Sequence, residues 1–201
     1  MNKQEMTVHI IDDDPATRDS LQWLIEAEDY QVRTFSNALS FLDNLPDETV
    51  GCILTDIRMP EMSGLELYQA LKEKSCSLPV IMITGHGDVA MAVNALKDGV
   101  YDFIEKPFDN RHLLERIEQA LQQSLTTQED LAARQEIEAR FETLTKREQE
   151  VMDKIVQGLS NKEMALELDI SIKTIEVHRS RVMEKMNAPS LASLVRMSIN
   201  I

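Results

Sequence analysis

Strand-like and helix-like segments alternate five times between residues 7 and 122. The strand-like segments are short and rich in Val and Ile, whereas apolar residues recur every three or four positions in the helix-like ones. The strand segments are 7–11, 30–35, 50–55, 79–84 and 101–105, and the helical segments are 15–28, 37–45, 65–74, 89–97 and 110–122. Apolar strands that are each followed by a helix predict a parallel sheet covered on both faces. We therefore expect a doubly wound α/β domain with five parallel strands.

The chain after residue 143 has a different pattern, made of short helices with capping signals. Thr145 with Glu148, and Ser160 with Glu163, have the spacing of capping boxes, and Ser171 precedes a third helix. The helices are expected to end near Gln157, Leu168, Met186 and Ile199. Two short helices joined by the tight turn 167–171 have the dimensions of a helix-turn-helix. Residues 144–201 are therefore predicted to form an all-α domain of four helices.

Residues 123–143 connect the two patterns and are predicted to be a helical linker. Apolar periodicity is lost at 123–130 and returns at 131–142. The linker is either a continuation of the helix that begins at 110 or a pair of helices with a joint near Thr126. Thr126 and Glu129 have the spacing of another capping box, which slightly favours the joint. The expected domains are thus 1–122, the linker 123–143, and 144–201.

The formal net charge of −14 is unevenly distributed. Residues 1–120 carry 22 acidic and 10 basic side chains, whereas residues 171–201 carry five basic and two acidic ones. The first part therefore repels nucleic acid and suits cations, and only the final helices can approach phosphates. The sequence has no run of 18 apolar residues, no signal-peptide pattern, and two cysteines without metal-ligand spacing, so a cytoplasmic protein is expected.

Acidic, hydroxyl and ammonium side chains follow the predicted strands. They are Asp12, Asp13 and Asp14 after the first strand, Asp56 after the third, Thr84 after the fourth and Lys106 after the fifth. Ligands of open parallel sheets bind at the carboxyl ends of the strands, so we expect these groups to converge. Clustered carboxylates suit Mg²⁺, beside which one of them can attack a phosphoryl group. Helix capping alone would explain a lone Asp pair, but not the groups on the other strands.

At this point the sequence resembles the two-component response regulators, specifically those that join a flavodoxin-like receiver domain to a LuxR/FixJ-type helix-turn-helix. The resemblance covers nearly the whole chain. It is carried by VHIIDDDPATR (8–18), ILTDIRMPEMSGLEL (53–67), VIMITGHGDVAMAV (80–93), DFIEKPF (102–108), LTKREQEVMDKIVQGLSNKEMALELDIS (144–171) and IKTIEVHRSRVMEKM (172–186). Because four separated segments of the receiver agree, this match is highly specific.

The resemblance implies a role for each receiver residue. Asp56 is the expected phosphoacceptor, and the Mg²⁺ ligands would be Asp13 directly, Asp12 often through water, Asp56, and the backbone carbonyl of Arg58. Thr84 would be the switch hydroxyl, Phe103 the aromatic that turns inward on activation, and Lys106 the phosphate-binding lysine. A run of three acids allows a shift of one residue, and we assign Asp14 to the helix start.

The third C-terminal helix is the candidate for DNA recognition. Ile175, Val182 and Met186 form its core stripe. The opposite face would enter the major groove, and the residues expected to reach the bases are Lys173, Glu176, Val177 and Ser180. The residues expected to contact phosphates are Thr174, Arg181 and Lys185 of this helix and Lys162 of the preceding one. By resemblance, the last helix around Leu191, Leu194 and Val195 forms a dimer contact; an ordinary place in the core is an equal alternative.

These observations predict a transcription regulator that is switched by phosphorylation. The expected partners are a sensor histidine kinase, a double-stranded DNA operator, a second copy of the phosphorylated chain and RNA polymerase, with no membrane. Its only catalysis would be its own phosphorylation and slow dephosphorylation, so it is not an enzyme by role. An aspartate-nucleophile phosphatase is the enzyme alternative, but Pro15 and Ala16 do not continue its D-x-D signature and Asp56 would be unexplained. The helix-turn-helix opposes a third reading, an adaptor that binds no DNA.

Overall fold

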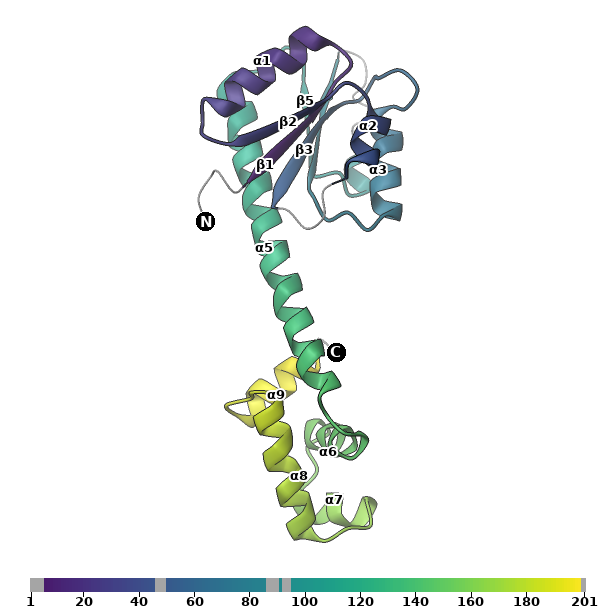
Figure 1. Cartoon of the computed structure of the whole chain (residues 1–201), viewed down its shortest axis with the longest axis vertical. Helices are drawn as coiled ribbons and strands as arrows, with labels where there is room; N and C mark the ends of the chain where they lie inside the picture. The colour runs from purple at the N-terminus through teal and green to yellow at the C-terminus, as the bar shows by residue number, and fades with distance from the viewer. Residues whose placement is uncertain (1–5, 46–49, 86–90, 92–94, 200–201) are drawn as a thin grey trace. The chain divides into compact units, whose positions relative to one another are not determined.

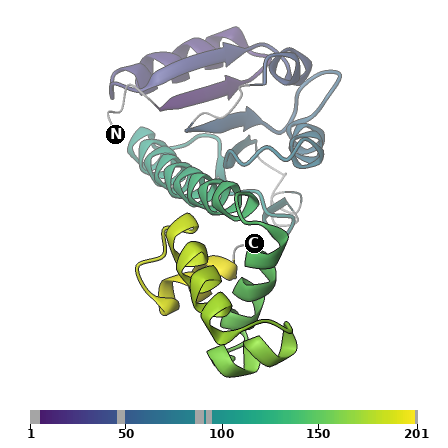
Figure 2. The same ribbon diagram turned by 60° about the horizontal axis from the view of Figure 1, so that its bottom comes forward.

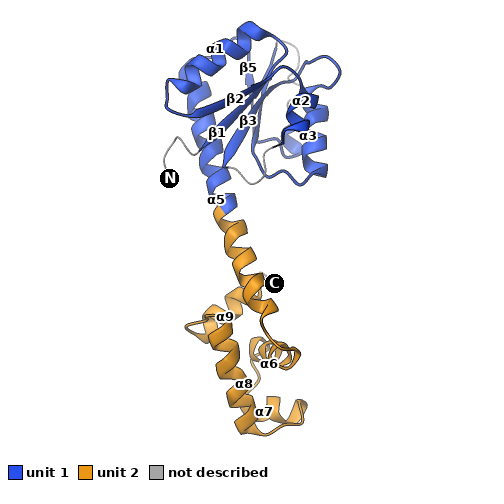
Figure 3. Ribbon diagram, in the orientation of Figure 1, with its two compact units in different colours: residues 1–128 blue, residues 129–201 orange. Residues whose placement is uncertain are grey.

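The computed structural model describes residues 6–45, 50–85, 91 and 95–199. It divides into two compact units, residues 1–128 and 129–201 (Figure 3). The first unit is an α/β fold with a core on each face of its sheet, and the second is all-helical with a core of its own. This confirms the fold class expected from the sequence.

The first unit contains one sheet of five parallel strands in the order β2-β1-β3-β4-β5. The strands are β1 Thr7–Ile11, β2 Gln31–Phe35, β3 Gly51–Asp56, β4 Val80–Thr84 and β5 Asp102–Glu105. All residues of β1, β3 and β4 are buried except Asp56, which explains their continuous apolar sequences. The strand order reverses between β1 and β3, so the carboxyl ends of these two strands border the crevice in which such sheets bind ligands.

Helices cover both faces of this sheet (Figures 1 and 2). They are α1 Pro15–Glu26, α2 Ala38–Asp43, α3 Gly64–Glu73 and the first part of α5 Asn110–Glu142. Leu21 of α1 and Ile117 of α5 belong to the core on one face, and Phe41 of α2 and Leu67 of α3 to the core on the other. The helix expected at 89–97 lies largely outside the described residues.

Helix α5 is continuous for 33 residues, so the slight preference for a joint near Thr126 was wrong. The Thr126 hydroxyl donates to the carbonyl of Gln122, 3.1 Å away within the helix, and therefore caps nothing. Ser124 is buried in the first unit, where its hydroxyl accepts a hydrogen bond from the Gly51 amide at 3.2 Å. Farther along, Phe141 packs against the core of the second unit. Both ends of the predicted linker thus take part in a core.

None of the helices in the described part of the chain is long and apolar enough to span a membrane.

The second unit contains α6 Lys146–Val156, α7 Asn161–Glu167, α8 Ile172–Lys185 and α9 Leu191–Ser198. Both predicted capping boxes are present, one at the start of α6 between Thr145 and Glu148 and one at the start of α7 between Ser160 and Glu163. Its core contains Val151, Met152, Ile155, Met164, Ile175, Val182, Met186 and Leu194. The predicted core stripe of α8 is therefore confirmed, and α7 and α8 form the helix-turn-helix pair.

Candidate functional site

Three carboxylates meet at the carboxyl ends of β1 and β3. Asp12, Asp13 and Asp56 each offer an oxygen, and these oxygens lie within 4.8 Å of one another. Asp12 is buried, Asp56 is half-buried and Asp13 is exposed. Lys106, which follows β5, places its Nζ 2.8 Å from Oδ2 of Asp56 and 3.3 Å from Oδ2 of Asp12. Because the carboxyl ends of the parallel strands lie at one edge of the sheet, side chains that are up to 94 residues apart in sequence meet there.

The charges in this cluster do not balance. Burial raises the pKa of Asp12, against the lowering effects of a hydrogen bond from the Asp14 amide and of Lys106. Burial also disfavours the Lys106 ammonium, but the hydrogen bonds and charges of Asp56 and Asp12 outweigh it and raise the Lys106 pKa. One ammonium therefore faces three acidic groups. An all-oxygen donor set with excess negative charge fits a hard divalent cation such as Mg²⁺.

The loop between β1 and α1 is held by short hydrogen bonds. Asp14 caps α1, because its carboxylate accepts from the Ala16 amide at 3.1 Å and from the Thr17 hydroxyl at 2.7 Å. Its own amide donates to Oδ1 of Asp12 at 2.9 Å. Arg18 of α1 reaches back, and its Nη1 donates to the Asp12 carbonyl at 2.6 Å. Sequence reasoning did not single out Arg18, since no spacing rule connects it to that carbonyl.

The end of β3 is fixed by a close backbone approach. The Arg58 amide donates to Oδ1 of Asp56 at 3.1 Å. Gly64, the first residue of α3, lies so close that a Cβ there would be 2.3 Å from the Asp56 carbonyl oxygen. Only glycine permits this approach, which positions the β3–α3 loop beside the acids. The Ser-Gly pair at the start of α3 was a signal that the sequence reasoning did not use.

Of the other predicted receiver residues, Thr84 ends β4 and Phe103 lies within β5. Thr84 is buried, and its hydroxyl donates to the Gly85 carbonyl at 3.1 Å instead of to Asp56. The Lys106 amide donates to the Thr84 carbonyl at 2.7 Å, which ties the two strand ends together. Phe103 is half-buried against the core beneath α2 and α3.

The face of α8 opposite its core stripe is open to solvent. Its exposed residues include Lys173, Thr174, Glu176, Val177, Ser180 and Arg181, and Lys162 is exposed on α7. Val177 is the apolar member of this face and has 45% of its surface exposed. The predicted DNA-facing residues other than Lys185 therefore share one accessible region of the helix-turn-helix.

Lys185 is held inside the second unit. Its Nζ lies 2.7 Å from Oε2 of Glu148 and 2.9 Å from the Thr143 carbonyl oxygen. Glu148 is only 2% exposed, and the hydrogen bond from Lys185, followed by that from the Thr145 amide, lowers its pKa to about 2. Because these bonds already engage the ammonium, we propose that Lys185 does not make the phosphate contact expected from the sequence.

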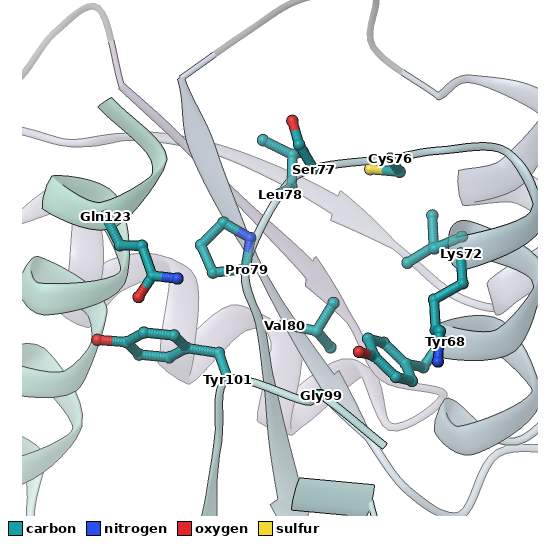
Figure 4. Close-up of a pocket in the computed structure, with 11 residues that line it drawn as sticks. Tyr68, Lys72, Cys76, Ser77, Leu78, Pro79, Val80, Gly99, Tyr101 and Gln123 are labelled. Carbon is teal, nitrogen blue, oxygen red and sulfur yellow. The ribbon is translucent and has the colours of Figure 1, made fainter. Parts of the chain in front are cut away.

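Two hollows of the first unit differ in their relation to the acids. A cavity of about 180 Å³ lies at the amino ends of β4 and β5, the opposite edge of the sheet, with Tyr68, Pro79, Tyr101 and Gln123 in its wall (Figure 4). It is smaller than common ligand pockets. An open hollow of about 430 Å³ between α1 and the segment after β5 includes Asp14 and Lys106 in its lining, and so lies beside the acid cluster.

Comparisons with known proteins match both units. Residues 8–118 fit the family described as response regulator receiver domain, and residues 142–198 fit the one described as bacterial regulatory proteins, luxR family. The transcriptional regulatory protein FixJ of Bradyrhizobium diazoefficiens is 45% identical over 192 residues, which cover 96% of this chain and 94% of FixJ. The response regulator protein TmoT of Ectopseudomonas mendocina is 43% identical over 198 residues, covering 98% and 90%.

Solved structures give the same result. The response regulator StyR, known from a low-resolution structure, has a TM-score of 0.88 and 40% identity, covering 98% of this chain and 100% of its own. Full-length FixJ from B. japonicum has a TM-score of 0.61 and 44% identity, covering 98% and 97%.

Proposed function

The chain belongs to the response regulators that join a receiver domain to a LuxR-type DNA-binding domain, and from that premise we propose that phosphorylation of Asp56 controls its binding to DNA. It is a FixJ-like transcriptional regulator. The receiver domain implies a kinase partner, which we take to be a sensor histidine kinase, and the LuxR-type domain implies DNA. The convergence of Asp12, Asp13, Asp56 and Lys106 carries the proposal.

The acid cluster supports a magnesium-assisted phosphoryl acceptor. Receiver domains bind Mg²⁺ at their acidic pocket, and here Asp12, Asp13, Asp56 and the Arg58 carbonyl would hold the ion. When bound, Mg²⁺ would screen the charge of the incoming phosphoryl group from the attacking carboxylate. Asp13 is exposed, so it can take part in binding without a large rearrangement of the core.

The proposed reaction is a transfer between two residues. An Asp56 carboxylate oxygen bonds to phosphorus while the bond from phosphorus to the histidine nitrogen of the kinase breaks, and the electron pair stays on that nitrogen. Lys106, already 2.8 Å from Asp56, would then bind a phosphoryl oxygen. The chain supplies these groups itself, so it would also accept phosphoryl from a small donor and slowly lose it to water.

The switch would run through Thr84 and Phe103. The Thr84 hydroxyl donates to a neighbouring carbonyl, and we propose that it turns to a phosphoryl oxygen after phosphorylation. Phe103, which is only half-buried, would then move inward. The altered surface would favour a homodimer, whose two DNA-binding units would occupy two half-sites of an operator and there meet RNA polymerase.

The outer face of α8 supports sequence-specific binding. Glu176 can accept a hydrogen bond from cytosine N4, and Val177 can contact a thymine methyl group. The cations that remain available for phosphates are Lys162, Lys173 and Arg181, with Thr174 and Ser180 as hydroxyl donors. The acidic receiver would hinder approach to DNA until phosphorylation changes its association.

Intact-mass measurement after treatment with acetyl phosphate and Mg²⁺ tests this function. The native chain should gain one phosphoryl group, and Asp56→Asn should gain none because its amide is not a competent nucleophile. Asp19→Asn, a matched change at an exposed aspartate of α1, should behave like the native chain. An Asp56→Asn chain that still gains phosphoryl would place the nucleophile elsewhere. Operator DNA should shift with the phosphorylated native chain at lower protein concentration than with Asp56→Asn.

A further inference from the structure

We propose that Arg18 is a positioning residue for the cation site, whose guanidinium orients the Asp12–Asp13 peptide so that both carboxylates face Asp56. The inference rests on the proposed function, because it concerns the Mg²⁺ site of the acid cluster. It assigns a role to a side chain that would not touch the cation, the phosphoryl group or the nucleophile.

The hydrogen bond from Arg18 reaches the backbone at the point that directs Asp13. Nη1 of Arg18 lies 2.6 Å from the Asp12 carbonyl oxygen, which belongs to the peptide that leads into Asp13. A peptide group is planar, so fixing this oxygen also fixes the plane of the Asp13 amide and limits the directions open to the Asp13 side chain. Arg18 is half-buried on α1, and that helix is anchored by the Asp14 cap.

Asp13 depends on this support more than its neighbour does. The Asp12 carboxylate is held directly by Lys106 and by the Asp14 amide. Asp13 is exposed, and its carboxylate makes no hydrogen bond among the residues that the structure describes. Its orientation therefore depends on the backbone. The bond from Arg18 holds this backbone at the Asp12 carbonyl, and the bond from the Asp14 amide to Oδ1 of Asp12 holds it on the other side of Asp13. Partners that orient the ligands of a metal commonly change its affinity by about 10- to 100-fold.

A purely electrostatic role for Arg18 predicts the opposite change in Mg²⁺ affinity, so the direction of the change distinguishes the two explanations. Arg18 is a cation near an acidic site, so removing its charge would tighten Mg²⁺ binding if charge were its only effect. Loss of positioning would weaken Mg²⁺ binding instead. Met and Lys have helix propensities close to that of Arg, so Arg18→Met and Arg18→Lys should leave α1 intact.

The experiment is a calorimetric titration of the full chain with Mg²⁺. Arg18→Met should bind Mg²⁺ about tenfold more weakly or worse, while Arg18→Lys, which keeps the charge and one donor, should lie between it and the native chain. Gln22→Met is the matched control one turn farther along α1 and should bind Mg²⁺ normally, because the side chain of Gln22 donates a hydrogen bond to Glu26, away from the acids. At saturating Mg²⁺, phosphorylation of Arg18→Met by acetyl phosphate should recover.

Unchanged or tighter Mg²⁺ binding by Arg18→Met would overturn the proposal. Asp13→Asn separates this failure from failure of the proposed function: if Asp13→Asn binds weakly while Arg18→Met binds normally, the metal site stands and Arg18 has no part in it. If Asp13→Asn also binds normally, the metal site itself is wrong. Should Arg18→Met fail to fold, Arg18→Lys decides, since native affinity in that variant would refute positioning through the guanidinium.

Discussion

Replacing Glu148 by Gln should destabilise the DNA-binding unit by an amount that depends on pH. The folded state lowers the Glu148 pKa from 4.5 to about 2, chiefly through the hydrogen bond from Lys185. A lowered carboxyl pKa contributes stability that is present in full above pH 4.5 and is lost as the pH falls toward 2. Glutamine keeps the size and the cap but cannot carry the charge.

The structure sets the size of this effect. The difference between the two pKa values corresponds to about 3 kcal/mol at neutral pH. Lys185 is 34% exposed at its side chain, so water screens the pair and the expected loss is about 1–3 kcal/mol. Fully exposed ion pairs contribute less to the free energy of unfolding, and we expect a larger contribution here because Glu148 is buried.

Urea unfolding of residues 129–201, followed by circular dichroism between pH 2 and 7, measures the effect. Glu148→Gln should be less stable than the native unit at pH 7, and the difference should shrink below pH 4.5 and vanish near pH 2. Glu163→Gln is the control, because Glu163 forms the same kind of capping box with no lysine partner among the described residues and should lose less. If the difference in unfolding free energy between Glu148→Gln and the native unit stayed constant with pH, the Glu148 charge would not be the source of the stabilisation.

Two further predictions concern the acid site and the DNA contacts. Gly64→Ala should slow phosphorylation by acetyl phosphate about 10- to 100-fold and lower the free energy of unfolding by about 1–3 kcal/mol, because the new Cβ would clash with the Asp56 carbonyl. A native phosphorylation rate together with a native unfolding free energy would show that the β3–α3 loop can move to accept the methyl group. For DNA binding, the slope of log K against log salt concentration should be no steeper than about −3 per protomer. Glu176→Ala should reduce the preference for one base pair by about 1–3 kcal/mol, whereas Arg181→Ala should lower the affinity for operator and scrambled DNA alike. Equal loss on both DNAs for Glu176→Ala would exclude base reading by this residue. The cations counted in the slope are Lys162, Lys173 and Arg181.

The sequence predicted the α/β unit well because its signals are local and its topology follows a rule. Each strand is recognisable from its own apolar residues, and parallel pairing places every carboxyl end on one edge. This rule alone predicts that Lys106 and Asp56, which are 50 residues apart in sequence, lie close together. The capping boxes of α6 and α7 were predictable for the same reason, since both partners lie within four residues.

The features that the sequence did not predict depend on contacts that no local pattern contains. Thr126 and Glu129 have the same spacing as Thr145 and Glu148, yet only the second pair starts a helix, because α5 continues through the first with Ser124 buried against the sheet. Lys173 and Lys185 lie on the same helix, yet of the two only Lys185 contacts a buried carboxylate, that of Glu148, and the carbonyl of Thr143 just after α5. Local periodicity predicts that each lysine lies off the core stripe, but whether its charge is free for phosphate depends on what another helix places beside it. For that reason the number of phosphate contacts, and with it the salt slope, follows from the tertiary structure and not from the count of basic residues.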